Sequence, residues 1–414
     1  MSDLQPVRGT RDILGAEARR HRHIEAIARD VARRYGFDEI STPIFEFTEV
    51  FARTLGETSD VVTKEMYTFT DRGGDSITLR PEGTAGVARA LISGGLAQHL
   101  PLKFFYAGPM FRYERPQKGR LRQFHQVGVE SLGLATPLVD AETIAVGHAM
   151  LRALGVADAI TLELNTLGDS ASRDAYRDAL VDYLRPFESE LSADSRTRLS
   201  RNPLRILDSK DTGDQEIIAG APDYGDYLNP ASREFFAGVT SVLEELDIPY
   251  ALNPRLVRGL DYYCHTAFEF TTDRLGSQGT VLAGGRYDGL VRSMGGPHAP
   301  GIGWAAGIER LAMLLGEAAA EKGPVVVVPL GDGLQTRGLA LTNHLRDHGY
   351  RAEMGFSGNL KKRLARANRM NAAVALILGE DEAAQNAVTV RDLDTGEQKL
   401  VALSGIESAL ARYR

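Results

Sequence analysis

Residues 111–130, FRYERPQKGRLRQFHQVGVE, constrain the fold more than any other stretch, because they place charged side chains inside two otherwise apolar strands. Side chains alternate between the faces of a strand, so Arg112 and Glu114 share one face of the first strand, and Gln126 and Glu130 share one face of the second. The loop between the strands adds four basic residues, Arg115, Lys118, Arg120 and Arg122. Buried charges are costly unless they are paired. This hairpin therefore predicts a site for a ligand that carries both a phosphate and an amine.

The composition is that of a globular protein and excludes several classes. The chain has 414 residues, which is too long for one core and predicts two or three domains. Its net charge of −7 gives no overall attraction for nucleic acid, so any such contact must use local basic patches. The single cysteine, Cys264, allows no internal disulfide and no cysteine-rich zinc site. The N-terminus lacks a signal-peptide pattern and the apolar runs are too short to span a membrane, so we expect a cytoplasmic protein.

The first part of the chain alternates between helix and strand patterns. Apolar residues at helical spacing predict an amphipathic helix over residues 16–35. The segment DEISTPIFEF, residues 38–47, is predicted to be a strand interrupted by Pro43. Proline cannot donate to a ladder, so we expect this strand at a sheet edge or an interface. Residues 62–80 predict a hairpin that turns at Gly73-Gly74.

The pattern changes twice further along the chain. Residues 168–250 consist mainly of predicted helices, which we interpret as an inserted helical module. After a candidate linker at 317–323, short apolar strands alternate with helices, as in a small parallel α/β domain. We therefore place one domain at residues 1–320, with a helical insertion at about 168–250, and a second domain at residues 324–414.

Two interpretations fit RPEGTAG, residues 80–86. Pro81 and Glu82 suit the start of a helix, where proline is tolerated and a carboxylate meets the positive end of the helix. Alternatively, Glu82 and Thr84 accept hydrogen bonds from a ligand ammonium group. Taken alone the pattern favours the helix start, because short motifs often occur by chance.

Three later segments have the features of a polar pocket. In LVRGLDYYCHTAFEF, residues 256–270, Arg258 and Tyr262 share a face if the strand is regular; a snorkelling arginine beside core tyrosines is the simpler alternative. AGGRYDGLV, residues 283–291, and GIGWAAGIERL, residues 301–311, contain small residues that either pack closely or admit a flat ligand such as a purine. No GxxxxGK[ST] or strand-linked GxGxxG motif occurs. The nine histidines show no HExxH motif, so no metal site is expected.

Together these segments resemble the class II aminoacyl-tRNA synthetases, and within that class the histidyl-tRNA synthetases. The helix and strand that end at Pro43 resemble the dimer-interface motif of the class. FRYERPQKGRLRQFHQ resembles its second motif and GIGWAAGIERL its third, while LVRGLDYY and AGGRYDGLV resemble two histidine-specific signatures. The resemblance implies an α+β fold in which helices flank an antiparallel six-stranded sheet, with a helical insertion and a C-terminal α/β anticodon-binding domain.

The resemblance also implies a reaction and a set of residues. L-Histidine and ATP give histidyl-adenylate and pyrophosphate, and the histidyl group then passes to the 3′ end of tRNA(His). ATP acts with Mg²⁺, no cofactor is permanently bound, and the protein is a homodimer. The implied catalytic residues are Arg258 and Arg112, and the implied ATP-binding residues are Arg112, Glu114, Arg258 and Arg310. The implied histidine-binding residues are Glu82, Gly83, Thr84, Gln126, Glu130, Tyr262, Tyr263 and Tyr287.

The C-terminal domain contains a basic helix stripe. Lys362, Arg366 and Arg369 have the spacing of one helix face, away from Leu360 and Leu364. Residues 324–414 hold 12 Lys and Arg against 10 Asp and Glu, a net of +2, whereas the whole chain is −7. A solvated helix face explains this stripe as well as contact with RNA does. Binding of tRNA phosphates by this stripe is the more specific hypothesis.

Two other functions stay open beside this interpretation. Some synthetase-like proteins bind histidine and act as a regulatory subunit of ATP phosphoribosyltransferase without charging tRNA. They typically lack the anticodon domain and have degraded ATP motifs, whereas both features are intact here. A synthetase specific for proline or threonine is disfavoured by LVRGLDYY.

Overall fold

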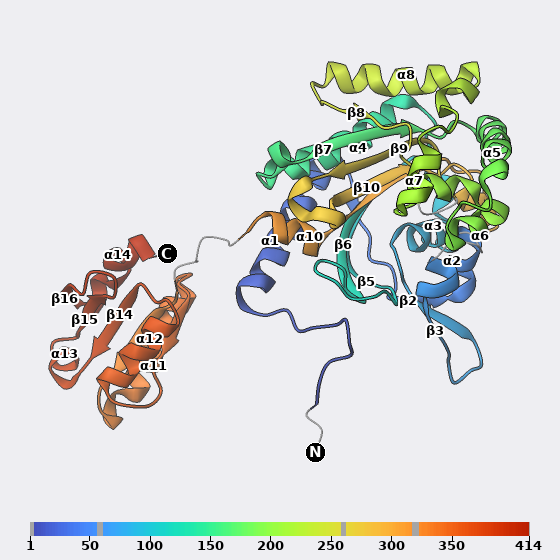
Figure 1. The fold of residues 1–414 in the computed structure, drawn as a ribbon. Coiled ribbons are helices and arrows are strands. Elements are labelled where there is room, and N and C mark those ends of the chain that lie inside the picture. Colours follow the sequence, from blue (N-terminus) through green and yellow to red (C-terminus); the bar gives the residue numbers. More distant parts are fainter. Residues whose placement is uncertain (1–3, 56–60, 258–261, 317–322, 414) are drawn as a thin grey trace. The chain divides into compact units, whose positions relative to one another are not determined.

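The computed structural model describes residues 4–55, 61–257, 262–316 and 323–413. The chain divides into two units, Met1–Ala318 and Ala319–Arg414, and each has its own hydrophobic core (Figure 1). Among the described residues, no helix is both long enough and apolar enough to cross a membrane.

A mainly antiparallel sheet of eight strands runs through the first unit in the order β1-β5-β6-β11-β10-β9-β7-β8 (Figure 1). The six central strands pair antiparallel and are β5 (Leu102–Phe111), β6 (Gln123–Leu132), β11 (Gly301–Gly307), β10 (Thr280–Arg286), β9 (Cys264–Thr271) and β7 (Thr161–Thr166). Two-residue strands, β1 (Asp38–Glu39) and β8 (Ala251–Leu252), pair in parallel at the edges. The six-stranded antiparallel sheet that the resemblance implied is confirmed.

Four helices cover one face of this sheet: α1 (Gly15–Arg34), α4 (Pro137–Ala153), α8 (Pro230–Glu245) and α10 (Ile308–Leu314). Their apolar residues share a core with Val127 and Val129 of β6. In α1 the buried residues Ile24, Ala28 and Val31 follow the spacing that predicted this helix. The alternation along β6 therefore directs Val127 and Val129 into the core and leaves Gln126 for the other face.

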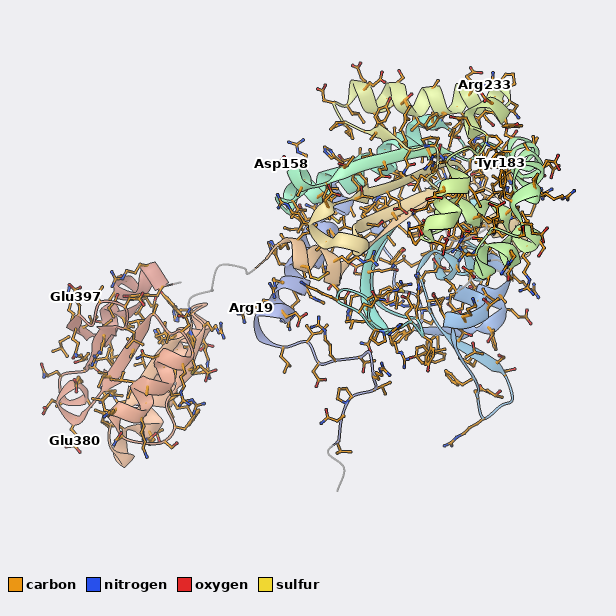
Figure 2. All side chains as sticks on the ribbon, in the orientation of Figure 1. Arg19, Asp158, Tyr183, Arg233, Glu380 and Glu397 are labelled. Atoms are coloured by element: carbon orange, nitrogen blue, oxygen red, sulfur yellow. The ribbon has the colours of Figure 1, made fainter. Side chains whose placement is uncertain are left out.

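The opposite face is supported by shorter helices. These are α3 (Thr84–Ser93), α9 (Leu290–Ser293) and the helices of the 168–250 region, α5 (Ser170–Leu184), α6 (Ala193–Arg201) and α7 (Thr212–Ile218). They share a second core with Tyr106 and Met110 of β5. Within the helical region, the hydroxyl of Tyr183 on α5 donates to the carbonyl of Ile217 on α7 at 2.8 Å (Tyr183 is labelled in Figure 2).

A small sheet, β2-β4-β3, lies beside this face. It contains β2 (Phe45–Phe47), β3 (Tyr67–Thr70) and β4 (Ser76–Leu79), and α2 (Thr48–Leu55) follows β2. The predicted hairpin is confirmed, with Gly74 at φ +94° in its turn. The prediction of one strand over residues 38–47 is wrong, because β1 and β2 belong to different sheets on either side of Pro43. Proline cannot continue the ladder, so the chain leaves one sheet there and enters another.

The second unit is built on a five-stranded sheet in the order β13-β12-β14-β15-β16. Its strands are β12 (Val325–Pro329), β13 (Ala352–Met354), β14 (Val374–Leu378), β15 (Ala387–Asp392) and β16 (Gln398–Ala402), and its helices are α11 (Gln335–Asp347), α12 (Leu360–Arg369), α13 (Glu380–Ala384) and α14 (Ile406–Leu410). The first three strands pair in parallel, and β15 and β16 form an antiparallel hairpin. Both β12 and β14 are buried throughout, as their continuous apolar runs predict.

Candidate active site

A cavity of about 430 Å³ opens on the polar face of the large sheet, between β6, β9, β10 and β11 and the starts of α3 and α10. The residues predicted from sequence that line it are Glu82, Thr84, Arg112, Glu114, Gln126, Tyr262, Tyr263 and Arg310. Glu130 and Tyr287 lie beneath its wall and are almost fully buried. Gly83 packs against the ring of Tyr106, which a Cβ at that position would overlap.

One end of the cavity is cationic. Arg310 on α10 is partly buried close to Arg120 and Arg112. Its burial, followed by these two positive charges, lowers the pKa of Arg310. Arg112 is held from two sides: its Nε donates to the carbonyl of Pro81 at 2.9 Å, and its guanidinium lies 5.4 Å from the centroid of the Phe124 ring. Three guanidinium groups at one end create the positive field that phosphate groups require.

The position of Arg112 corrects one detail of the sequence prediction. The strand β5 ends at Phe111, so Arg112 and Glu114 follow the strand and do not lie within it. Both side chains still line the cavity. The backbone N–H of Arg112 donates to the carbonyl of Arg122 at 2.9 Å, which prolongs the pairing of the two segments by one bond. Glu114 forms an ion pair with Arg120.

The other end of the cavity contains acceptors. The two carboxylate oxygens of Glu82 accept from the backbone N–H groups of Thr84 and Ala85 at 2.7 and 2.8 Å, so Glu82 caps the start of α3. The helix-start interpretation of RPEGTAG is confirmed for Glu82, whereas Pro81 precedes the N-cap residue Gly83 and lies outside the helix. The carboxylate of Glu82 also lines the cavity. Burial raises the pKa of Glu82, and the two N–H bonds oppose that rise. The Oε1 atom of Gln126 is buried and has no hydrogen-bond partner among the described residues.

Glu130 is the most deeply buried acid of the site, with no exposed surface. Thr84 donates its hydroxyl to Oε1 of Glu130 at 2.7 Å, and the hydroxyl of Tyr287 donates to Oε2. Gly303 on β11 lies directly over this carboxylate, and a Cβ there would collide with Oε2. Burial raises the pKa of Glu130 to about 8, although the bonds from Tyr287 and Thr84 oppose the shift.

Tyrosines form an aromatic wall beside these acids. The rings of Tyr262 and Tyr263 lie with centroids 4.5 Å apart, and the ring of Tyr262 lies 5.7 Å from that of Tyr287 in an edge-on arrangement. The strand expected within residues 256–270 begins only at Cys264, so both tyrosines precede β9. Arg258, the other functional residue expected in this segment, lies outside the described residues.

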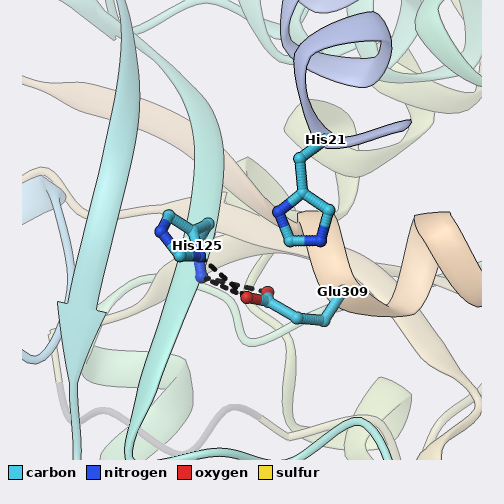
Figure 3. Close-up of side chains that lie close together, drawn as sticks. All are labelled: His21, His125 and Glu309. Carbon is cyan, nitrogen blue, oxygen red and sulfur yellow. Dashed lines mark hydrogen bonds and ion pairs between the residues drawn. The ribbon is translucent and has the colours of Figure 1, made fainter. Parts of the chain in front are cut away.

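Sequence reasoning missed a link between the two arginine-bearing segments. Glu309 of α10 accepts from the backbone N–H of His125 at 3.1 and 3.0 Å and from its Nδ1 at 2.8 Å, and His21 of α1 points toward the same place (Figure 3). Burial alone would raise the pKa of Glu309, but the bonds from His125 lower it below its usual value. The link joins β6 next to Gln126 with α10 next to Arg310. No local pattern could reveal it, since its members are far apart in the sequence.

A second missed residue is Arg286, which lies inside the AGGRYDGLV segment. Its guanidinium is fully buried and donates from Nε to the carboxylate of Asp140 on α4 at 3.0 and 3.1 Å. It also bonds to Asp288 at 2.7 Å. This buried ion pair fixes the end of β10 directly before Tyr287, whose hydroxyl holds Glu130.

In the second unit, the predicted basic stripe lies on the exposed side of α12. Lys362, Arg366 and Arg369 are exposed, whereas Ala367 is buried. Arg363, which was not part of the predicted stripe, turns inward and donates to the carbonyl of Gly358 at 2.7 Å. The helix therefore presents three cations to solvent on a face without apolar anchors.

The six-stranded antiparallel sheet, with Arg112 directly after β5 and Arg310 on α10, is the arrangement of a class II aminoacyl-tRNA synthetase. The sequence matches the family model described as histidyl-tRNA synthetase over residues 9–311 and the model described as anticodon binding domain over residues 324–413. The chain belongs to the histidyl-tRNA synthetase family.

Full-length relatives agree with this assignment. The chain is 62% identical to the histidine–tRNA ligase of Rhodospirillum rubrum, with all of both chains covered, and 59% identical to that of Gluconacetobacter diazotrophicus, with 99% of both covered. The crystal structure of the apo histidyl-tRNA synthetase of S. aureus superposes with a TM-score of 0.82 at 37% identity, covering 98% of this chain and 99% of that one.

The raised pKa of Glu130 predicts a pH-dependent stability. An unfolded glutamate titrates near ~4.3, whereas Glu130 titrates at about 8 in the folded protein. Between these values the folded state binds the extra proton, so the free energy of unfolding falls as pH rises and levels off above pH 8. Replacement of Glu130 by glutamine should remove a decline on the order of a few kcal/mol, measured by urea unfolding at pH 5 and pH 8. An unchanged decline in the Glu130→Gln variant would show that proton uptake by Glu130 is not its cause. The exposed Glu188→Gln serves as control.

Proposed function

We propose that the chain is a histidine–tRNA ligase that uses this cavity to activate L-histidine with ATP and then transfers the histidyl group to tRNA(His). The observation that carries the proposal is the set of polar groups that line one cavity: three arginines, one of them paired with Glu114, together with the carboxylate of Glu82 and the unpaired amide oxygen of Gln126. A phosphate-bearing nucleotide and an ammonium-bearing amino acid fit such a cavity side by side. The full-length relatives supply the particular specificity.

In the first step, a carboxylate oxygen of histidine attacks the α-phosphorus of ATP, and the bond from that phosphorus to the bridging oxygen breaks to release pyrophosphate. Negative charge grows on the α-phosphoryl oxygens. Arg112 is placed to stabilise this charge, since its guanidinium is already held by Pro81 and Phe124. Arg310 supports the nucleotide. By family resemblance Arg258 approaches the α-phosphate and the histidine carboxylate, and it remains a proposal from sequence.

Histidine recognition is assigned to the acceptor end. Glu82, Thr84 and Gln126 bind the α-amino group, and the buried unpaired Oε1 of Gln126 supports this role. By family resemblance Glu130 and Tyr263 are assigned to the imidazole, with Tyr262 and Tyr287 completing the pocket. Contact between Glu130 and the ring requires the cavity wall over Glu130 to move, because this carboxyl is fully buried here. A site that bonds both ring nitrogens leaves buried polar groups unpaired with any substrate that lacks them, which is a strong source of specificity.

Mg²⁺ accompanies ATP in this proposal. Glu114 and Glu269 line the cavity together with the arginines and offer the carboxylate oxygens that this hard cation prefers. When bound there, Mg²⁺ would neutralise part of the phosphate charge.

The second unit is assigned to tRNA. Its match to the anticodon-binding model and the exposed cations of α12 support this role. The presence of this unit argues against the alternative function, a regulatory subunit of ATP phosphoribosyltransferase. The arginines of the cavity are a second argument, because a regulatory subunit that only binds histidine does not require an ATP site.

We also propose that the protein works as a cytoplasmic homodimer. Support for a dimer comes from Phe45 and Phe47 on β2, which are 58% and 57% exposed next to Ile44 at 43%. Exposed apolar groups that gather on one strand mark an interaction surface. The strand belongs to the segment that resembles the dimer-interface motif of the class.

Pyrophosphate exchange tests the proposed function directly. The purified chain is expected to exchange labelled pyrophosphate into ATP when histidine is present and not when proline or threonine replaces it. Charging of tRNA(His) in the same preparation separates a ligase from a regulatory histidine-binding protein. A folded preparation that binds histidine without exchange would overturn the assignment.

A further inference from the structure

Two histidines and a glutamate lie together on the second unit, outside the site described above. His344 lies in the last turn of α11, His348 directly follows that helix, and Glu407 lies on α14. The Nε2 atoms of His344 and His348 lie 2.9 and 3.3 Å from Oε1 of Glu407. The two rings are tilted by 42°, with centroids 4.3 Å apart. Two imidazole nitrogens therefore face a single carboxylate oxygen.

The hydrogen bonding of His348 determines which ring nitrogen carries the proton. Its Nδ1 lies 2.8 Å from the carbonyl oxygen of His344. A carbonyl oxygen only accepts, so Nδ1 is the donor, and Nε2 of the neutral ring presents a lone pair to Glu407. A lone pair and a carboxylate oxygen 3.3 Å apart repel each other unless a proton or a metal cation lies between them.

The backbone that carries these side chains is well anchored. The hydroxyl of Tyr350 donates to the carbonyl of Glu407 at 3.0 Å, and Ile406 and Leu410 bury the other side of α14 in the core of the unit. On α11, Leu341 and Leu345 enter the same core. The three side chains are thus presented on a rigid frame at 44–46% exposure, with room for water to complete a coordination sphere.

We propose that His344, His348 and Glu407 bind one divalent transition-metal cation of the zinc type. Zinc bonds of ~2.0–2.2 Å in tetrahedral geometry place neighbouring ligand atoms about 3.3 Å apart. The two nitrogen–oxygen separations, 2.9 and 3.3 Å, are close to this value, and all three ligand atoms lie within 4.8 Å of one another. Two imidazoles and one carboxylate suit Zn²⁺, whereas Mg²⁺ prefers oxygen ligands alone. This proposal is independent of the proposed function, since no residue of the cavity takes part.

The group of His21, His125 and Glu309 offers the same ligand types and provides a contrast (Figure 3). There the carboxylate of Glu309 already accepts the backbone N–H and the ring Nδ1 of His125. A metal ion would have to displace these bonds inside the protein. Around Glu407, the imidazole nitrogens are themselves the partners, so a cation would take the place of these side-chain contacts at the surface without displacing a backbone hydrogen bond.

Calorimetric titration of the full chain, prepared without a histidine tag, tests the proposal with Zn²⁺ alone at pH 7.5. One equivalent is expected to bind, and the paired replacement of His344 and His348 by alanine should weaken binding at least as much as loss of an outer-shell partner does, ~10–100-fold. Glu407→Gln should cause a smaller loss of the same kind. His23→Ala, which removes an exposed helical histidine elsewhere, should leave binding unchanged. Mg²⁺ in place of Zn²⁺ should give no heat at this site.

Circular dichroism confirms that each variant is folded, which is expected because the replaced side chains are half exposed. Retention of full Zn²⁺ affinity in the double variant would overturn the proposal. So would loss of binding in His21→Ala with retention in the double variant, because the metal would then lie in the first unit. Absence of any Zn²⁺ binding would also overturn it and identify the group as an imidazolium–carboxylate ion pair.

Discussion

Replacement of Arg112 by alanine is expected to slow histidyl-adenylate formation by ~10²–10³-fold, the scale for loss of one preorganised electrostatic donor. The guanidinium is held by the carbonyl of Pro81 at 2.9 Å and by the Phe124 ring before any substrate arrives. Its stabilisation of the growing phosphoryl charge therefore requires no reorganisation during the reaction. Single-turnover mixing of enzyme, histidine and ATP measures this rate without contributions from tRNA.

The control for Arg112 is Arg115→Ala. Arg115 lies three residues further on, is exposed and does not line the cavity. Its replacement should leave adenylate formation close to the wild-type rate. Arg112→Lys should retain part of the activity, since lysine keeps the charge but loses the planar fork. A near-normal rate for Arg112→Ala would assign this arginine to the structure of the hairpin and leave the phosphate contact to other cations.

Removal of residues 324–414 is expected to abolish most tRNA charging while leaving adenylate formation within about tenfold, or ~1.4 kcal/mol in the barrier. The residues that line the cavity all belong to the first unit, which has its own core. Contacts remote from the reacting atoms contribute to the transfer step by positioning the long substrate, so their loss should cost ~10²-fold or more in charging. Aminoacylation of tRNA(His) and pyrophosphate exchange measure the two steps separately.

Substitutions in the full-length chain test whether the second unit binds tRNA without removing that unit. Joint replacement of Lys362, Arg366 and Arg369 by alanine should reduce the slope of log affinity against log salt by about 2 to 3, because each phosphate contact contributes roughly 0.7–0.9. Replacement of Arg351 and Lys399, which are exposed cations outside α12, should change this slope less. Unchanged charging in the truncated protein would remove the second unit from RNA recognition.

The backbone of the site was largely predictable from the sequence. The period of two along FRYERPQKGRLRQFHQVGVE predicted that Gln126 and Glu130 share one face of the second strand, because alternation is a property of any strand. In the structure Gln126 lines the cavity, and Val127 enters the core on the other face. The segment GIGWAAGIERL, whose small residues predicted close packing or a flat ligand, forms β11 and the start of α10, which carries Arg310 to the cavity. Boundaries were less accurate: β5 ends before Arg112 and β9 starts after Tyr263, since strand ends depend on which partner strand is present.

The identities of the residues thus fixed which chemistry the chain can perform, since arginines, carboxylates and an amide within recognisable local patterns already specify a phosphate and an amine. Only the tertiary structure decided which of them meet and in what state. His125 with Glu309, Arg286 with Asp140 and His344 with Glu407 are pairs joined across long stretches of chain. Likewise, the pKa of Glu130 rises to about 8 because folding removes water from that carboxyl. The local sequence does not determine which carboxyl becomes fully buried.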